Sequence, residues 1–146
     1  MIVLPDVNVL VYAFRRESSL HERYAAWPAD LLSGADEVGV TEGSLIGFLR
    51  IVTNPRIYAD PAPTSDALVF VDVVRLARRR RWVGVTDAVW TTFSALVDSD
   101  PQVRGNLLPD AWLAALALAH GCRLATADRG FARFDGLDWF DPARPR

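Results

Sequence analysis

The sequence predicts an α/β protein with a central, mainly parallel sheet of four to five strands. Short apolar runs alternate along the chain with amphipathic segments of helical length, and this strand-helix-strand order is typical of a parallel sheet covered on both faces. The size agrees, because 146 residues with 51% hydrophobic and 23% charged residues suit one domain with one core. The sequence contains no internal repeat and no linker, so we expect a single domain over residues 1–146.

The predicted strands are short apolar runs bounded by turn-forming or polar residues. They cover residues 2–4, 38–40, 82–85 and 122–126, with 137–140 as a weaker fifth strand. Helices are expected between them. The strongest runs from Pro109, which suits a first helical turn, to Gly121, which suits a helix stop. Three prolines within residues 54–64 predict a loop between two helices.

The composition indicates which cellular compartment and which classes of partner to expect. The single cysteine, Cys122, cannot form an internal disulfide, and the longest mostly apolar stretch, residues 111–119, is too short to span a membrane. No signal-peptide pattern precedes the first strand, so we expect a cytoplasmic protein with no membrane partner. The net charge of -2 gives no overall attraction to nucleic acid, although all 16 basic residues are arginine and a local basic groove is compatible with this balance.

The first residues, MIVLPDVNVLVYA, place Asp6 and Asn8 in an otherwise apolar segment. A carboxylate withdrawn from water is unfavourable unless it is paired, hydrogen-bonded or bound to a metal. Asp6 follows the first predicted strand, at the carboxyl end where open α/β sheets bind ligands. A helix N-cap also explains Asp6, and for this residue alone capping is the simpler interpretation.

Three further acids occupy the same kind of position. They are Glu42 and Asp128, which each follow a predicted strand, and Asp110, which opens the strongest predicted helix. Each has a helix-start or turn explanation of its own. Together with Asp6, however, they predict a shared cleft in which mutual repulsion is relieved by a cation.

The ligand types indicate which cation that is. Carboxylates without histidine or cysteine partners suit Mg²⁺ or Mn²⁺ rather than zinc. His21 is expected in a loop or on a helix surface and His120 near a helix C-terminus, so neither supports a zinc site. A divalent cation in such a cleft can activate water and stabilise negative charge on phosphorus. The four acids therefore predict metal-assisted phosphodiester hydrolysis.

The same residues carry a resemblance to a known family. The segments that carry it are DVN at the first acid, TEGSLIGFLRIVTNPRIY at the second, and GNLLPDAWLAALALAHGCRLATADRGFARFDGLDW at the last two. In this order they resemble the PIN-domain proteins, and more closely the VapC ribonuclease toxins of bacterial toxin-antitoxin pairs. The similarity spans nearly the whole chain.

The resemblance implies a three-layer α/β/α fold and an endoribonuclease that depends on Mg²⁺ or Mn²⁺. The residues that match the family's catalytic and metal-binding acids are Asp6, Glu42, Asp110 and Asp128, and those that match supporting polar positions are Asn8 and Thr126. The implied partners are an RNA substrate, a cognate antitoxin protein and a second copy of the chain in a homodimer.

Other residues near these motifs have more than one interpretation. Arg129 and Arg133 are candidates for phosphate contact because they lie beside Asp128 and arginine binds phosphate through paired hydrogen bonds. The arginine run at 78–81 fits either nucleic-acid binding or a helix end, where positive charge complements the helix dipole. Trp112 fits either the core or the wall of the cleft.

Alternative functions predict different sequence features. A PIN-like scaffold that binds RNA or protein without cutting it would lack one or more of the acids, and all four are present. A phosphatase of the dehalogenase-like type usually shows Asp-x-Asp-x-Thr and a later lysine, whereas this chain has Asp-x-Asn-x-Leu and no lysine. No Gly-x-Gly-x-x-Gly follows a predicted strand, which argues against a dinucleotide enzyme.

Overall fold

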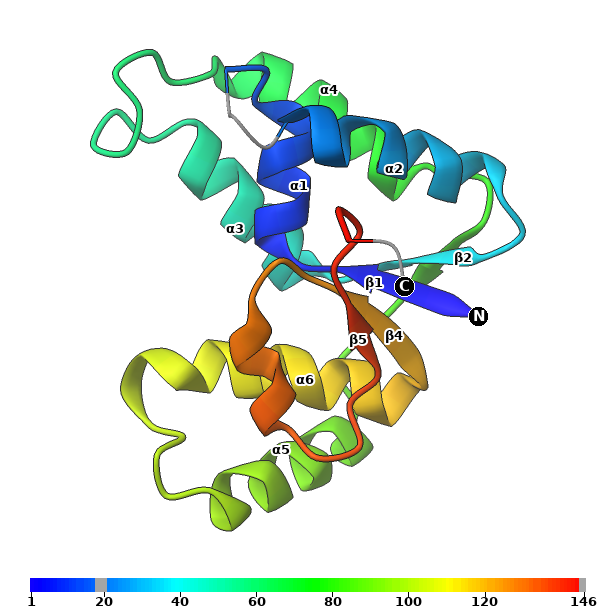
Figure 1. Ribbon diagram of the computed structural model, residues 1–146, viewed down its shortest axis with the longest axis vertical. Coiled ribbons are helices and arrows are strands. Elements are labelled where there is room, and N and C mark those ends of the chain that lie inside the picture. Colours follow the sequence, from blue (N-terminus) through cyan, green and yellow to red (C-terminus); the bar gives the residue numbers. More distant parts are fainter. Residues whose placement is uncertain (18–20, 145–146) are drawn as a thin grey trace.

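In residues 1–17 and 21–144, which the computed structural model describes, five parallel strands form one sheet in the order β3-β2-β1-β4-β5 (Figure 1). The strands are β1 (Ile2–Pro5), β2 (Glu37–Val40), β3 (Arg80–Trp82), β4 (Cys122–Ala125) and β5 (Trp139–Phe140). The helices are α1 (Val7–Phe14), α2 (His21–Ser33), α3 (Glu42–Val52), α4 (Thr64–Arg75), α5 (Asp87–Ser99) and α6 (Leu108–His120). Short 3₁₀ helices precede α6 and follow β4, namely η1 (Gly105–Leu107) and η2 (Arg129–Arg133).

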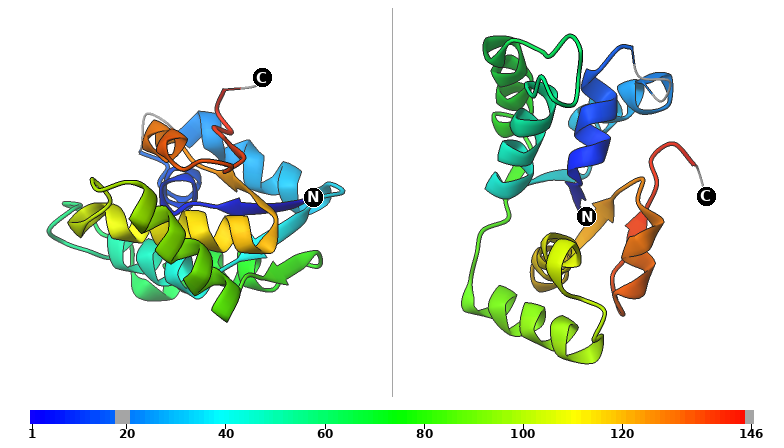
Figure 2. Two further views of the ribbon diagram at one scale, coloured as in Figure 1. Left: turned by 90° about the horizontal axis from the view of Figure 1, so that it is seen from below. Right: turned by 90° about the vertical axis from the view of Figure 1, so that its left-hand side faces the viewer.

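The helices make two outer layers around the sheet. Helices α1 to α4 lie on one face, and α5 and α6 lie on the other (Figures 1 and 2). Side chains of a strand alternate between the two faces, so each strand contributes to both cores. Val3 and Ala125 pack under α1 to α4, whereas Leu4 and Leu124 pack under α5 and α6. The predicted three-layer α/β/α fold is confirmed.

The strand order creates a switch point at β1. The chain passes from β1 to β2 on one side, and it returns from β3 to β4 on the other side of β1. In open α/β sheets the ligand crevice lies beyond the carboxyl ends of the strands at such a point. β1 and β4 pair in register as far as Pro5 opposite Ala125, so the residues that follow them, Asp6 and Thr126, emerge side by side.

One predicted strand is displaced along the chain. β3 occupies Arg80–Trp82 rather than residues 82–85. It is an edge strand that pairs with β2, and its residues are exposed, so its sequence lacks the apolar character used to predict strands. The apolar residue that favoured the later position is Val83, which is buried in the core beneath α5 and α6 just after the strand.

The arginine run at 78–81 is not a helix end, as one interpretation held. Helix α4 ends at Arg75, whereas Arg78 and Arg79 form a turn and Arg80 and Arg81 belong to β3. Arg81 pairs there with Glu37 of the neighbouring strand, with the guanidinium Nε 2.6 Å from a carboxylate oxygen. The arginine run therefore contributes to the exposed edge strand of the sheet.

The helix boundaries follow the turn signals in the sequence. The proline-rich loop predicted at residues 54–64 connects α3 to α4, which begins at its last residue. Helix α6 is capped at its C-terminus by Gly121, whose φ of 66° places it in the left-handed region that glycine adopts without strain. In the described ranges, no helix combines the length and the apolar character needed to cross a bilayer.

Candidate active site

Asp6 stands at the carboxyl end of β1 and caps α1. Its Oδ1 accepts a hydrogen bond from the backbone N–H of Val7 at 2.7 Å, and its Oδ2 accepts one from the Thr126 hydroxyl at 2.7 Å. The backbone N–H of Asp6 donates to the carbonyl of Ala125 at 2.8 Å. The cap and the link between strands thus hold the carboxylate in one orientation at the switch point.

Thr126 and Asn8 connect the ends of β1 and β4. The fully buried Thr126 hydroxyl accepts a hydrogen bond from the backbone N–H of Asp128 at 3.0 Å and one from the Asn8 side-chain amide at 3.5 Å. The Asn8 side-chain oxygen accepts the backbone N–H of Ala127 at 3.3 Å. These two polar residues therefore fix Asp6 relative to the backbone that carries Asp128.

Asp6, Asp110 and Asp128 are close enough to affect one another electrostatically. Burial raises the pKa of Asp6, hydrogen bonds from Thr126 and Val7 oppose that rise, and the charges of Asp110 and Asp128 add to it. The pKa of Asp110, in the first turn of α6, is also raised by burial and by the charge of Asp128. The charge of Asp128, in the segment after β4, thus acts on both Asp6, which follows β1, and Asp110 of α6.

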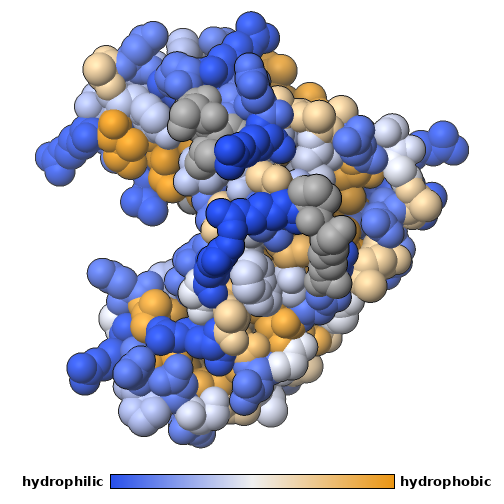
Figure 3. All heavy atoms as spheres, viewed as in Figure 1, coloured by the Kyte–Doolittle hydropathy of each residue, from blue (hydrophilic) through white to orange (hydrophobic). Residues whose placement is uncertain are grey.

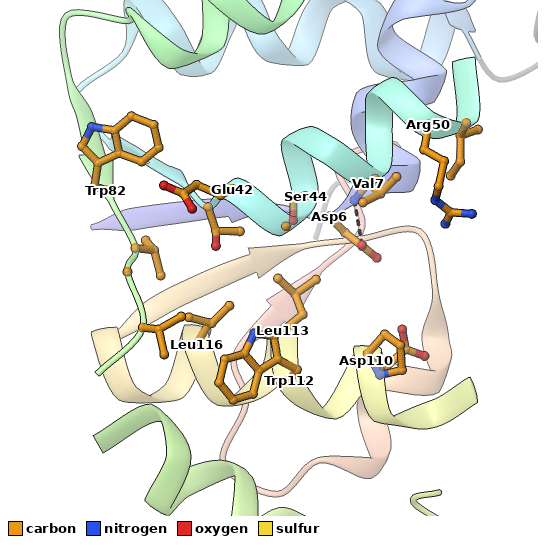
Figure 4. A pocket seen from close by; sticks show the side chains of 18 residues that line it. Asp6, Val7, Glu42, Ser44, Arg50, Trp82, Asp110, Trp112, Leu113 and Leu116 are labelled. Atoms are coloured by element: carbon orange, nitrogen blue, oxygen red, sulfur yellow. Dashed lines mark hydrogen bonds between the residues drawn. The ribbon is translucent and has the colours of Figure 1, made fainter. Parts of the chain in front are cut away.

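A cleft of about 690 Å³ opens between α3 and α6 at this edge of the sheet. Figure 3 shows the surface hollowed between the part formed by α1 to α4 and the part formed by α5 and α6. Asp6, Glu42 and Asp110 all line the cleft. The carboxylate of Glu42, however, points toward Trp82, at the other end of the cleft from Asp6 and Asp110 (Figure 4). Of the four predicted acids, Asp6 and Asp110 thus lie at one end of the cleft and Glu42 at the other. Asp128 is not among the residues that line the cleft, and it acts on Asp6 and Asp110 through its charge.

Several cleft residues are not singled out by the sequence motifs. Arg50 on α3 lines the cleft at the same end as Asp6 and Asp110 (Figure 4). The helical spacing of Gly43, Gly47 and Arg50 is a signal that could have found it, since all three lie on one stripe of α3 that faces the cleft. A Cβ on Gly47 would lie 3.1 Å from a methyl group of Val7, so this glycine allows α3 to approach α1 closely.

Trp112 combines both roles that its sequence position suggested. It lines the cleft and is partly buried. Its ring centroid lies 4.5 Å from that of Trp90 and 5.3 Å from that of Phe93, both on α5. Trp82 at the end of β3 also lines the cleft and is 47% exposed, which its prediction as the first residue of a short apolar strand did not indicate.

The remaining candidate residues differ in how they relate to the acids. Arg133 lowers the pKa of Asp110 by its charge, and its guanidinium donates to Gln102 at 3.2 Å and lies 3.7 Å from Asp100. Arg129 is exposed on η2, directly after Asp128.

The two histidines lie near backbone carbonyls. The ring nitrogens of His21 and His120 lie 3.1 Å and 2.7 Å from the carbonyl oxygens of Tyr12 and Gly84. Neither histidine is among the residues that line the cleft.

The donor set suits a hard divalent cation. It consists of Asp128 together with Asp6 and Asp110, whose pKa values are raised by burial and by the charge of Asp128, and a cation would relieve both effects. Within the described residues, no three acidic, histidine or cysteine side chains are grouped closely enough to enclose a metal ion. Mg²⁺ commonly keeps several waters and binds through one or two carboxylates. Asp6, Asp110 and Asp128 therefore fit an ion that is held partly through water.

Comparison with known proteins agrees with this geometry. A family model described as PIN domain matches residues 3–137. VapC ribonuclease Mb2897 of Mycobacterium bovis is 38% identical over 137 residues, which cover 94% of this chain and 92% of the relative. Ribonuclease VapC33 of Mycobacterium tuberculosis is 32% identical over 151 residues, which cover 98% of this chain and 99% of the relative.

Solved structures with the same fold come from more distant proteins. VapBC2 from Rickettsia felis, bound to a DNA fragment from its promoter, matches with a TM-score of 0.70 at 17% identity, over 97% of this chain and 98% of that one. VapBC-1 from nontypeable Haemophilus influenzae matches with a TM-score of 0.67 at 16% identity, over 99% and 100%. Together with the family match and the relatives above 30% identity, these likenesses show that the chain belongs to the PIN-domain family and, within it, to the VapC group.

Proposed function

We propose that this chain is an endoribonuclease, dependent on Mg²⁺ or Mn²⁺, that acts in the cytoplasm as the toxin of a toxin-antitoxin pair. The observation that carries the proposal is the position of Asp6 and Asp110 in the lining of the cleft beside the switch point of the sheet, where the charge of Asp128 raises the pKa of both. The cleft beside them is open to solvent and large enough for part of an RNA strand. Relatives named VapC ribonucleases, similar over nearly the whole chain, support the same activity.

The residues of the chain have separate tasks in this proposal. Asp6, Asp110 and Asp128 hold the cation. When bound, the cation supplies Lewis-acid polarisation of the phosphodiester and a lowered pKa for water. Thr126 and Asn8 orient Asp6 through the hydrogen bonds described above.

Two residues of α3 act on the substrate side of the cleft. Arg50, at the acidic end, attracts the RNA phosphate and offsets the repulsion between phosphate and carboxylates. We place Glu42 among the residues that face the RNA rather than among the direct metal ligands, because its carboxylate points toward Trp82.

Protein partners are part of the proposal as well. An antitoxin is proposed because the VapC relatives extend over almost the whole chain and the fold matches VapBC structures. A homodimer is also proposed. An apolar stripe made by Val69 and Val73 on α4 and by its C-cap residue Leu76 is exposed, and protein partners commonly cover surfaces of this kind. The native mass of the chain, measured alone and with the antitoxin, tests both assemblies.

The activity is tested by cleavage of structured RNAs with purified chain that has been freed of antitoxin. We expect cleavage with Mg²⁺ or Mn²⁺ and none with a chelator. Asp110→Asn should lose most cleavage while keeping RNA affinity, because the change weakens cation binding without removing positive surface. Asp87→Asn is the matched control, since Asp87 also lies in the first turn of a helix but outside the cleft lining.

The outcomes separate the nuclease from a binding scaffold. A scaffold would bind RNA or protein without cutting either, and Asp110→Asn would leave its binding unchanged. Cleavage by Asp110→Asn at the rate of the parent chain would contradict the proposed roles of the acids.

A further inference from the structure

The cleft has two chemically different ends. At one end lie Asp6 and Asp110 with Arg50, and at the other lie Trp82 and Glu42 (Figure 4). The acidic end is accounted for by the proposed cation and phosphate. The other end exposes the large aromatic ring of Trp82 to solvent.

Trp82 is placed so that its ring remains accessible. It is the last residue of the edge strand β3, it is 47% exposed, and it lines the cleft. Figure 4 shows its ring beside the cleft rather than packed into the core. A tryptophan on an edge strand has an apolar face that water covers poorly, and a planar ligand would cover it better.

Trp112 faces the same cleft from α6 and is held rigidly. It packs against Trp90 and Phe93 on α5, with ring centroids 4.5 Å and 5.3 Å away. Because the neighbouring rings already restrict the rotamers of Trp112, a ligand that contacts this side chain causes little further loss of conformational entropy. The cleft therefore has aromatic groups on two of its walls, one from β3 and one from α6.

The charge of Glu42 indicates which part of a nucleotide fits this end. Its carboxylate points toward Trp82 and would repel a phosphate there. A nucleobase is uncharged and planar, so it is compatible with both the ring and the carboxylate. Arg50 at the opposite end has the charge that a phosphate requires.

We infer that Trp82 and Trp112 form a base-stacking subsite for single-stranded RNA, in which a base of the strand bound in the cleft lies against Trp82. This inference rests on the proposed ribonuclease function and names the form of its substrate, a strand whose bases are unpaired and splayed. Stacking on an aromatic side chain is tolerant of sequence and contributes about 1 to 3 kcal/mol per base. Duplex RNA hides its base faces and would not use this subsite.

The test measures binding rather than cleavage. The probe is a fluorescein-labelled oligo(A) RNA of about ten nucleotides, compared with a ribose-phosphate strand of equal length that carries no bases. Fluorescence anisotropy with the full chain, in chelator so that nothing is cut, gives Kd for each. We expect the parent to bind oligo(A) about 5- to 100-fold more tightly than the base-free strand.

Substitutions at one position isolate stacking from apolar contact. Trp82→Leu should weaken oligo(A) binding about 5-fold or more and leave the base-free strand unchanged, whereas Trp82→Phe should keep most of the affinity. Both side chains are apolar, but only phenylalanine has an aromatic face. The exposed position makes either change tolerable for folding, and thermal melting checks this.

Each outcome has one meaning. Equal affinity of the parent for the two strands would overturn the inference, and so would equal oligo(A) binding by Trp82→Leu and the parent. Loss of antitoxin binding by Trp82→Leu with RNA binding intact would show that the aromatic end serves a protein partner instead. If the parent binds bases at Trp82 but cuts no RNA with Mg²⁺, the proposed function fails and the subsite stands.

Discussion

Replacement of Thr126 by valine tests whether the link between β1 and β4 holds Asp6 in place. The two side chains have nearly the same shape, so the change removes a hydroxyl without opening a cavity. That hydroxyl is fully buried, donates to the Asp6 carboxylate at 2.7 Å and accepts the backbone N–H of Asp128 at 3.0 Å. Thr126→Val therefore leaves one carboxylate oxygen, one backbone N–H and the Asn8 side-chain amide without this hydroxyl as a partner.

The cost follows from the charge on Asp6. A hydrogen bond to a charged group contributes about 1.5 to 3 kcal/mol, and a buried donor without a partner adds to the loss. We expect Thr126→Val to lower the free energy of unfolding by about 2 to 3 kcal/mol at neutral pH. Thr126→Ser keeps the hydroxyl and loses one methyl group, so it should cost only about 1 kcal/mol.

The pH dependence identifies the partner of the hydroxyl. Burial raises the pKa of Asp6, and the Thr126 hydrogen bond lowers it by favouring the ionised form. Removing that bond is therefore most costly when Asp6 is ionised. As the pH falls through the pKa of Asp6, the carboxyl group becomes protonated, and the difference between the parent and Thr126→Val should shrink.

Urea unfolding of the parent, Thr126→Val and Thr126→Ser, in chelator and over a range of pH, measures these differences. A valine variant as stable as the parent at neutral pH would refute the reasoning. A loss of stability that is the same at every pH would show that Asp6 is not the group that the hydroxyl stabilises.

Three further predictions concern stability. Without metal and at neutral pH, Asp6→Asn should melt at or above the melting temperature of the parent, because the raised pKa of Asp6 means that its ionised form is disfavoured in the folded state. This gain in stability should vanish at about pH 3, where the carboxyl group of the parent is protonated. Millimolar Mg²⁺ should raise the melting temperature of the parent more than that of Asp128→Asn, and equal shifts would count against a shared cation site. In chemical unfolding, Gly43→Ala should raise the free energy of unfolding by up to about 1 kcal/mol, since a Cβ at this position would meet no atom within 4 Å. Gly47→Ala should give no such gain, because its Cβ would lie 3.1 Å from a methyl group of Val7.

The sequence was sufficient to predict most of the fold and the placement of three acids. Apolar strands that alternate with amphipathic helices specify a parallel sheet, and parallel strands bring the residues after them to one edge. Asp6 and Asp128 could be placed for this reason, and Asp110 because Pro109 marks a helix start. These positions follow from local sequence patterns, and packing between distant segments did not change the elements that the patterns predict.

The features that the sequence could not predict depend on contacts between distant segments. β3 lies at an exposed edge and carries arginines, so its position depends on pairing with β2 rather than on its own composition. The direction of Glu42 and the exposure of Trp82 follow from the way α3 and β3 border the cleft opposite α6. No local sequence pattern indicates how α3 and β3 lie relative to α6.

The most direct test of the central claim is to locate the cation. Crystals grown with Mn²⁺ and recorded at a wavelength where manganese scatters anomalously reveal each bound ion as a peak. We predict a peak among Asp6, Asp110 and Asp128, with its strength reduced in Asp110→Asn. A map of the parent chain with no peak there, or with manganese bound only elsewhere, would contradict the assignment of these carboxylates to a metal-dependent nuclease centre.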